Sequence, residues 1–407
     1  MFYYIPGDIN LNELSELDIL AKREAKKYPH KREKYASIAI PAGRSFVGIV
    51  GPRGVGKSVL LKQLASESDY AFYLSLDTVE EESLFELARN LHERLKVRLL
   101  LIDEIHFTKK YQKELKKIYD FLEIHVVFSS SVLLSLYESA YDLSRRVRME
   151  HLLPFSFREF LFFKHGVRLP VLSLNNILAN RELNEYLRYE FAFEDYLKGG
   201  LFPFSLEEPE VKPILQNVLN TIIRRDIPQV AHLNVEELDV IQKTVRFIGR
   251  SEVDGISYSS VARNLGITKY KSEQYVQLLE KAFVINPVFP AGTNVLREPK
   301  ILMFLPYRLL FKEYADSIGA LREDFLSEAL LAAGISFSYL KSTRGAKTPD
   351  YLLNLGQEQI IVEVGGKGKG REQFKGVDIN KSKKMLILSH GGSIEGIKRS
   401  LFLIGFL

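Results

Sequence analysis

The chain has 407 residues, of which 46% are hydrophobic and 26% are charged, and it contains no cysteine. This composition is typical of a folded protein with a substantial core, and it excludes disordered and fibrous proteins. The lack of cysteine excludes disulfide frameworks, thiolate metal sites and cysteine nucleophiles. The length predicts two or three domains. Because no apolar run is long enough to span a bilayer and the first residues lack a secretory pattern, we expect a cytoplasmic protein with no membrane partner.

The net charge of +5 is distributed unevenly along the chain. Residues 22–34 and residues 365–384 each carry seven basic side chains against two acidic ones, so the remainder of the chain is acidic. Two basic segments on an acidic body favour an anionic partner, of which nucleic acid is the commonest. Solvated charged faces give the same counts, and this second interpretation stays open.

The strongest motif follows an apolar run at residues 46–50, which predicts a strand. Residues 51–58, GPRGVGKS, match the pattern G-x-x-x-x-G-K-[ST] of a phosphate-binding loop. In such a loop, successive backbone N–H groups and the N-terminus of the next helix form a concave site for phosphates. Lys57 would reach the β- and γ-phosphates of ATP, and Ser58 would bind Mg²⁺. The candidate nucleotide-binding residues are Gly51, Pro52, Arg53, Gly54, Val55, Gly56, Lys57, Ser58 and Val59.

A second apolar run, residues 98–102, ends in Asp103 and Glu104. Its uniform hydrophobicity predicts a central strand of a parallel sheet, and ligands bind at the carboxyl ends of such strands. We therefore expect Asp103 to hold the Mg²⁺ shell and Glu104 to orient and deprotonate the attacking water. Capping of the strand end is the alternative role for both.

The segments around these motifs alternate as a doubly wound α/β fold requires. The expected strands are residues 71–76 and 125–128, and the expected helices are residues 84–95, 112–122 and 133–145. Three serines, residues 129–131, follow the strand at 125–128. Ser130 is our candidate for contact with the γ-phosphate or the attacking water, and capping of the next helix is an equally good interpretation.

Arg145 and Arg146 lie at the end of the helix expected at 133–145, just before a short strand expected at 147–152. An arginine in this position could act as a finger that enters the nucleotide site of a neighbouring subunit. That role requires a homo-oligomer, formed with nucleotide. The alternative is local pairing with the carbonyl groups at the helix C-terminus.

The motifs described so far, together with the phrase HLLPFSFREFL at residues 151–161, resemble the AAA-type ATPases that are widespread in archaea and bacteria. Many of these proteins end in a nuclease-like domain. The resemblance implies an ATPase core that uses ATP and Mg²⁺, a helical lid, a winged helix and a small α/β C-terminal domain. We assign them to residues 1–153, 154–245, 246–310 and 311–407 respectively.

Residues 103–106, DEIH, also spell the D-E-x-H box of helicases. A helicase of that class needs a second motor domain, and no second α/β ATPase pattern follows residue 150. We therefore favour the AAA-type interpretation. His106 is then expected to be a polar contact near the nucleotide or a surface residue.

Residues 256–285 show the pattern of a helix-turn-helix. Ser259 and Ser260 can cap one helix, Gly266 can end it, and Thr268 can cap a second. If this winged helix reads DNA, Lys269, Tyr270, Lys271 and Gln274 would face the groove. Packing of the same face against the ATPase core is the alternative.

In the C-terminal part we expect a helix at residues 321–333, strands at 351–355 and 359–364, and then a second helix. Together with Glu323, Asp350 and Glu363, this order resembles the PD-(D/E)XK nuclease superfamily. The resemblance implies that the three carboxylates bind Mg²⁺ and that a lysine follows two residues after the last glutamate. Gly365 stands at that position, so Lys367 or Lys369 would have to replace the lysine.

The missing lysine favours an inactive domain that binds DNA or protein without cleaving it. Two functions therefore remain open for an ATPase of this kind. One is a machine that couples ATP hydrolysis to DNA through the winged helix and the C-terminal domain. The other is a nucleotide-switched regulatory protein whose C-terminal domain binds protein partners.

Overall fold

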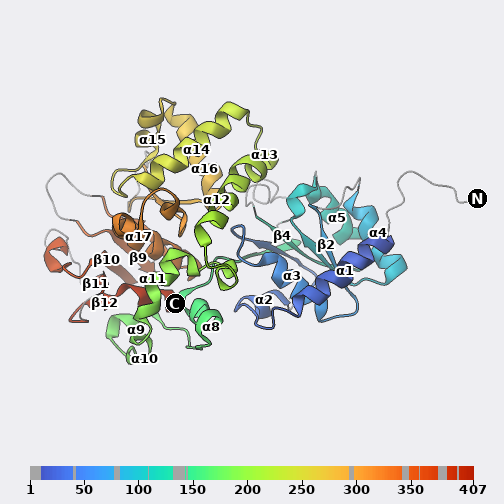
Figure 1. Ribbon diagram of the computed structural model, residues 1–407, viewed down its shortest axis with the longest axis horizontal. Helices are drawn as coiled ribbons and strands as arrows, with labels where there is room; N and C mark the ends of the chain where they lie inside the picture. The colour runs from blue at the N-terminus through green and yellow to red at the C-terminus, as the bar shows by residue number, and fades with distance from the viewer. Residues whose placement is uncertain are drawn as a thin grey trace, which may run out of the picture. The chain divides into compact units, whose positions relative to one another are not determined.

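The computed structural model describes residues 11–39, 43–77, 83–108, 110–131, 143, 145–292, 298–341, 348–356, 358–374, 383–391 and 394–407. The chain forms two compact units. The first comprises Met1–Leu153 together with Arg225–His232, and the second comprises Pro154–Arg224 together with Leu233–Leu407. Eight residues from the segment that we expected to form the lid therefore belong to the first unit. Figure 1 shows the elements of both units.

The first unit is built on a five-stranded sheet with the order β2-β3-β4-β1-β5. All neighbouring strands are parallel. The strands are β1 Phe46–Val50, β2 Ala71–Ser75, β3 Leu99–Asp103, β4 His125–Ser130 and β5 Val147–His151. The α/β fold with a parallel central sheet, which we predicted from the alternation of apolar runs, is confirmed.

Helices cover this sheet because its strands carry apolar residues on both faces. The helices are α1 Leu11–Ala25, α2 Tyr35–Ala39, α3 Lys57–Ser66, α4 Leu84–Leu95 and α5 Tyr111–Phe121. Helices α4 and α5 contribute Leu87, Leu91 and Leu115 to the main core, where they join strand residues such as Leu100 and Ile102. Helix α3 packs against β2, β3 and β4, and α1 packs against α3. Most of the helix expected at residues 133–145 lies outside the described residues.

The second unit begins with helices, as we expected for residues after 154. They are α8 Phe157–His165, α9 Leu174–Ala179, α10 Asn184–Leu187, α11 Phe193–Asp195 and α12 Val211–Thr221, with α14 Val235–Arg250 following later. Between α12 and α14 lies α13 Ile227–Val230, which belongs to the first unit. Capping boxes at Ser156 and Asn234 start α8 and α14, because each cap side chain accepts a hydrogen bond from the backbone N–H three residues on.

Two helices joined by a tight turn follow, α15 Tyr258–Leu265 and α16 Lys269–Lys281. Ser257 caps α15, Gly266 ends it with a left-handed φ of 65°, and Thr268 caps α16. Strands β6 Ile285–Val288 and β7 Lys300–Met303 then pair in antiparallel fashion. The cap of α15 is thus Ser257, rather than Ser259 or Ser260 as the sequence suggested.

The C-terminal part combines α17 Tyr314–Ala332 with a five-stranded sheet of order β12-β11-β10-β9-β8. Strands β8 to β10 are antiparallel, whereas β10, β11 and β12 run parallel. Their bounds are β8 Ser336–Tyr339, β9 Tyr351–Leu355, β10 Glu358–Gly366, β11 Lys383–His390 and β12 Lys398–Ser400. We predicted two of these five strands.

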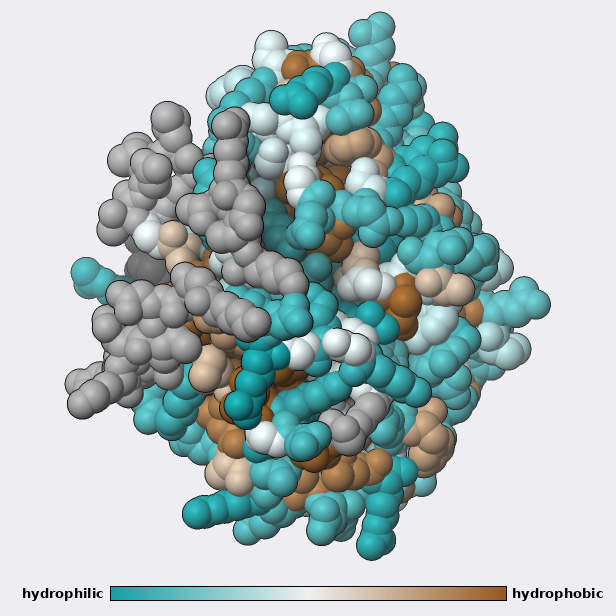
Figure 2. All heavy atoms as spheres, turned by 90° about the vertical axis from the view of Figure 1, so that its left-hand side faces the viewer, coloured by the Kyte–Doolittle hydropathy of each residue, from teal (hydrophilic) through white to brown (hydrophobic). Residues whose placement is uncertain are grey.

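Between β10 and β11 the described residues form a 3₁₀ turn, Arg371–Phe374, and the rest of the segment where the second helix was expected lies outside the described residues. The sequence missed β8, β11 and β12 because β8 and β12 are too short for their alternation to stand out, and β11 begins in a lysine cluster. In the described part of the chain, no helix is both long enough and apolar enough to cross a membrane. Figure 2 shows a largely hydrophilic face on the side of the molecule at the left of Figure 1, with apolar side chains gathered in smaller areas.

Candidate nucleotide site and a second acidic cluster

The phosphate-binding loop connects β1 to α3, and its glycines are required by the backbone. Gly54 and Gly56 have φ angles of 87° and 89°, which L side chains rarely adopt. A Cβ atom on Gly51 would lie 1.9 Å from the carbonyl oxygen of Leu152, at the end of the neighbouring strand. Residues 51–56 form the loop, whereas Lys57, Ser58 and Val59 form the first turn of α3.

Lys57 is buried, with 5% of its surface exposed. Its Nζ donates hydrogen bonds of 2.9 Å to the carbonyl oxygens of Gly51 and Pro52, so the ammonium group lies over its own loop. Burial lowers the pKa of Lys57, and the nearby carboxylates of Glu104 and Asp103 oppose that shift. A bound phosphate would supply the anion that this buried cation lacks.

Asp103 ends β3 and is 3% exposed. The hydroxyl of Tyr73 donates a 2.9 Å hydrogen bond to Oδ2, and the hydroxyl of Ser129 donates to Oδ1. Burial and the Asp103 charge raise the pKa of Tyr73, so this hydroxyl keeps its proton. Sequence analysis missed Tyr73, and its only signal was its position within the strand predicted at residues 71–76.

Glu104 adopts a left-handed backbone conformation, with φ 52° and ψ 51°. Such angles are uncommon for a glutamate, and they persist where the surrounding structure holds the residue in place. Three contacts hold the residue: Glu104 N donates to Ser129 Oγ at 3.0 Å, Ser131 N donates to Glu104 Oε2 at 3.2 Å, and His106 Nδ1 lies 3.3 Å from the same oxygen. Asp103 and Glu104 thus lie at the edge of the sheet where we expected them.

His106 is 7% exposed, so it is one of the buried polar residues near Glu104 rather than a surface residue. Its Nδ1 lies 3.2 Å from the hydroxyl of Ser130. Burial lowers the pKa of His106, which favours the neutral imidazole at pH 7. Ser130 is itself 1% exposed and contacts this imidazole.

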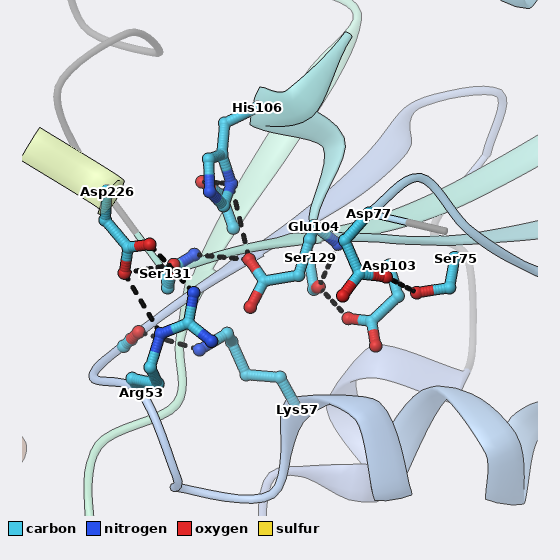
Figure 3. A network of polar contacts seen from close by, with 12 residues as sticks. Arg53, Lys57, Ser75, Asp77, Asp103, Glu104, His106, Ser129, Ser131 and Asp226 are labelled. Atoms are coloured by element: carbon cyan, nitrogen blue, oxygen red, sulfur yellow. Dashed lines mark hydrogen bonds and ion pairs between the residues drawn. The ribbon is translucent and has the colours of Figure 1, made fainter. Parts of the chain in front are cut away.

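The three serines after β4 therefore hold three different groups. Ser129 contacts Asp103, Ser130 contacts His106, and Ser131 contacts Glu104 through its backbone N–H. Figure 3 shows Ser129 beside Asp103 and Ser131 beside Glu104. The sequence predicted a functional role for the triplet but could not divide it among the three residues.

Asp226 is the second residue that sequence analysis missed. It is fully buried and accepts hydrogen bonds from Arg53 Nε at 3.0 Å and from Arg53 Nη2 at 2.8 Å. Burial works to lower the pKa of Arg53, but the pairing with Asp226 outweighs it and the pKa is raised. The neighbouring Arg225 places its guanidinium 4.6 Å from the centre of the Phe107 ring. The only signal in the sequence was a charged Arg-Arg-Asp step within a helical segment.

Arg146 forms an ion pair with Asp120 at 3.0 Å, and its guanidinium lies 5.4 Å from the centre of the Tyr119 ring. Arg145 is exposed. Both arginines precede β5 directly, as the sequence predicted. Their role toward a neighbouring subunit stays a prediction.

The second unit contains the other acidic cluster, formed by Glu323, Asp350 and Glu363. Asp350 accepts a 2.7 Å hydrogen bond from Val364 N. Burial and the charges of Glu323 and Glu363 raise the pKa of Asp350 to about 7. The three carboxyl groups are therefore neighbours, although no group of three or more Asp, Glu or His side chains in the described ranges could hold a metal ion.

Basic and hydroxyl groups contact two of these carboxylates, those of Glu323 and Glu363. Lys300 Nζ lies 2.6 Å from Glu323 Oε2, and the hydroxyl of Tyr351 donates to the same oxygen at 2.5 Å. Lys369 Nζ forms an ion pair with Glu363. A Cβ atom on Gly365 would lie 2.2 Å from Lys369 Cγ, so the stem of this lysine fills the space above the glycine.

Lys367, which we included in the candidate site, points elsewhere. Its side chain lies against Gly391, where a Cβ atom would come within 2.8 Å of Lys367 Cε. Lys369 is therefore the lysine that reaches Glu363. The physical reason is that the stem of Lys369 occupies the space that Gly365 leaves empty in β10.

On α16, the basic residues expected to face DNA are partly paired with acids. Lys269 lies 2.5 Å from Glu298, and Lys271 lies 3.3 Å from Glu237. Tyr270 is 68% exposed, and Gln274 donates a 3.0 Å hydrogen bond to its hydroxyl. This surface is open but is not strongly basic.

The first unit therefore has a parallel sheet with a phosphate-binding loop after its first strand and two acids at the end of its third. Residues 43–161 match a family model described as an AAA domain. Residues 190–304 match a domain of unknown function, DUF8612. The first of these matches supports the resemblance of residues 43–161 to an AAA-type core.

Two archaeal relatives from Methanocaldococcus jannaschii are similar to the chain. The "Uncharacterized protein MJ1637" is 26% identical, over 96% of this chain and 91% of that protein. The "Uncharacterized protein MJ1544" is 28% identical, over 58% of this chain and 55% of that protein. The first of these similarities extends across both units.

Solved structures with similar parts include the Aeropyrum pernix ORC1 protein in complex with DNA. It is 15% identical, with 79% of this chain and 94% of that chain covered and a TM-score of 0.29. The RuvB Holliday junction branch migration motor of Thermotoga maritima is 17% identical, with 69% and 90% covered and a TM-score of 0.25.

Proposed function

We propose that the first unit binds ATP with Mg²⁺ and hydrolyses it. The observation that carries the proposal is the convergence of Lys57, Asp103 and Glu104 at the carboxyl end of β3, each held by separate hydrogen-bond partners. Charges gathered in this way accelerate phosphoryl transfer by stabilising the charge that develops in the transition state.

Each side chain has a distinct role in this proposal. The ammonium group of Lys57 would leave the two loop carbonyls and neutralise the β- and γ-phosphates. The Glu104 carboxylate would accept a proton from the attacking water. The hydroxyl of Ser58 and the carboxylate of Asp103 are hard oxygen donors, which fit a Mg²⁺ ion that keeps several waters. Bound Mg²⁺ would supply charge neutralisation of the phosphates.

The direct test is ATP turnover by the full-length protein, with phosphate release measured with and without Mg²⁺. We expect turnover that depends on Mg²⁺ and disappears in Lys57→Ala. Binding of a fluorescent ATP analogue to the same proteins separates loss of binding from loss of chemistry. A protein that binds no nucleotide under these conditions would refute the proposal.

We propose further that the second unit couples the ATPase to DNA through α16. The exposed Tyr270, Lys269 and Lys271 support this proposal, as does the helix-turn-helix formed by α15 and α16. If they contact phosphates, affinity for duplex DNA should fall steeply between about 50 and 200 mM salt.

The matched variants are Lys269→Gln with Lys271→Gln, and Lys198→Gln as the control. Lys198 is an equally exposed lysine that pairs with Glu194 at 2.6 Å in the same unit. We expect the double variant to bind DNA more weakly and the control to bind as the parent does. Undetectable DNA binding at low salt would favour the alternative, a nucleotide-switched protein that binds protein partners.

For the acidic cluster of the second unit we propose that no DNA cleavage occurs. The lysines on Glu323 and Glu363 support this, because they supply the positive charge that a metal ion would otherwise bring. Incubation of plasmid with Mg²⁺ or Mn²⁺ tests it. Nicking that is lost in Asp350→Ala and in Lys369→Ala, but retained in Lys367→Ala, would show that the site is active.

A further inference from the structure

Arg53 and Lys57 bring two cations into the eight residues of the phosphate-binding motif. Like charges at such short range repel, and an unpaired arginine beside a buried lysine would turn to solvent. Arg53 does not, because the carboxylate of Asp226 holds two of its nitrogens at 3.0 and 2.8 Å. Asp226 comes from a segment more than 170 residues further along the chain.

Asp226 is itself held in place. It is fully buried, and the hydroxyl of Ser131 approaches its Oδ2 at 3.4 Å. Segment Arg225–His232 belongs to the first unit, and Arg225 stacks on Phe107 directly after the Glu104 turn. The carboxylate is therefore part of the wall of the nucleotide site, and its position is set by groups on both sides.

The guanidinium of Arg53 still has a free side. The described residues provide no hydrogen bond to Arg53 Nη1, and 24% of the side chain is exposed. Figure 3 shows the guanidinium close to the Lys57 ammonium and the Glu104 carboxylate. In the proposed function, Lys57 contacts the β- and γ-phosphates and Glu104 contacts the attacking water. The exposed side of Arg53 would then lie near the terminal phosphate.

We propose that Arg53 is a second phosphate-binding cation, which contacts the terminal phosphate of ATP, and that Asp226 is the positioning residue that fixes its guanidinium. The inference rests on the proposed ATPase function. A bidentate carboxylate fixes the plane of a guanidinium, which an ammonium group could not match. A cation held in this way stabilises the developing charge without first having to be ordered.

The experiment measures the dissociation constants of ATP and ADP and the single-turnover rate in the full-length protein. For Arg53→Gln we expect ATP binding weaker by about tenfold or more and ADP binding weaker by about threefold at most, since ADP lacks the terminal phosphate. For Asp226→Asn we expect an ATP affinity within about threefold of the parent but a rate lower by about tenfold, because the charge remains while its position does not.

Two further variants test positioning itself. Asp226→Glu keeps the carboxylate and should restore part of the rate. Arg53→Lys keeps the charge but loses the bidentate fork, so adding Asp226→Asn to it should lower the rate little further. Asp324→Asn is the matched control, because Asp324 is as buried as Asp226 and forms a bidentate pair with Arg308 in the other unit. It should leave the ATP and ADP constants unchanged.

The outcomes are distinguishable. Equal losses of ATP and ADP affinity in Arg53→Gln would overturn the assignment to the terminal phosphate. Faster turnover or tighter ATP binding in Asp226→Asn would overturn positioning, because Asp226 would then compete with phosphate for Arg53. If Asp226→Asn does not fold, Asp226→Glu and Arg53→Lys still decide. A parent protein that binds no nucleotide would instead refute the proposed function.

Discussion

The two acidic clusters of this chain are built on different principles. In the first unit, Asp103 and Glu104 are held mainly by neutral donors: the hydroxyls of Tyr73 and Ser129 and the backbone N–H of Ser131. In the second unit, Glu323 and Glu363 are held by the ammonium groups of Lys300 and Lys369. Neutral donors orient a carboxylate and leave its charge available. Lysines cancel that charge.

This difference suggests different uses for similar residues. An acid that keeps its charge can act as a base or bind a cation, whereas an acid paired with a buried lysine contributes to structure. A cluster of carboxylates is therefore insufficient evidence for a catalytic site. The partners of the carboxylates decide, and the following predictions test that distinction.

The largest effect is expected at Glu104. Glu104→Gln should still bind ATP while turnover falls by about 10²-fold or more, because the amide cannot accept the proton of the attacking water. Single-turnover measurements with saturating ATP check this. In the second unit, Glu363→Gln should leave ATP turnover unchanged. A similar loss of turnover in Glu363→Gln would contradict the distinction between the two clusters.

A second large effect is expected for mixed oligomers. Lys57→Ala and Arg146→Ala proteins should each be inactive, and mixing them should restore part of the turnover if Arg146 acts in a neighbouring site. The same mixture with Arg145→Ala identifies which of the two arginines acts. Formation of hetero-oligomers must be shown by mass measurement in the presence of nucleotide. Without recovery in such oligomers, the role of Arg146 is local, as its ion pair with Asp120 and its contact with the Tyr119 ring indicate.

A moderate effect is expected at His106. His106→Asn should lower the turnover rate by about tenfold and change ATP affinity less than about twofold, because His106 contacts Glu104 rather than the loop. The matched control is His92→Asn, which removes a hydrogen bond between Nδ1 and Val97 O at the end of α4. Equal effects of the two substitutions would show that His106 acts only through stability.

The smallest effect concerns stability and pH in the second unit. The pKa of Asp350 is raised from 3.8 to about 7, so the folded chain keeps this proton where the unfolded chain has lost it. The resulting stabilisation is complete below pH 4 and is lost as the pH rises toward 7. Asp350→Asn should therefore be more stable than the parent at pH 8, by about a few degrees in melting temperature, and equal to it near pH 4.

Thermal denaturation with and without Mg²⁺ sharpens this last comparison. If lysines have replaced the metal, Mg²⁺ should not change the melting temperature of the second unit. A stabilisation by Mg²⁺ that Asp350→Asn abolishes would show that the cluster binds metal after all.

Much of the first site followed from the sequence alone because its determinants are local. The glycines of the loop, Lys57 and Ser58 lie within eight consecutive residues, and the backbone geometry that binds phosphate is encoded by their spacing. Asp103 and Glu104 were predictable for a similar reason, since an apolar run predicts a central strand and strands of a parallel sheet present their ends at one edge.

The partners of these residues were decided only by the tertiary structure. Tyr73 reaches Asp103 across neighbouring strands, Asp226 reaches Arg53 from the middle of the chain, and Lys369 reaches Glu363 because Gly365 leaves room beside it. No periodicity or spacing encodes such contacts, because each depends on how distant segments pack. The sequence determined which groups could take part in chemistry. Packing determined which of their charges remain available, because a charge is cancelled or preserved by the groups that the fold places beside it.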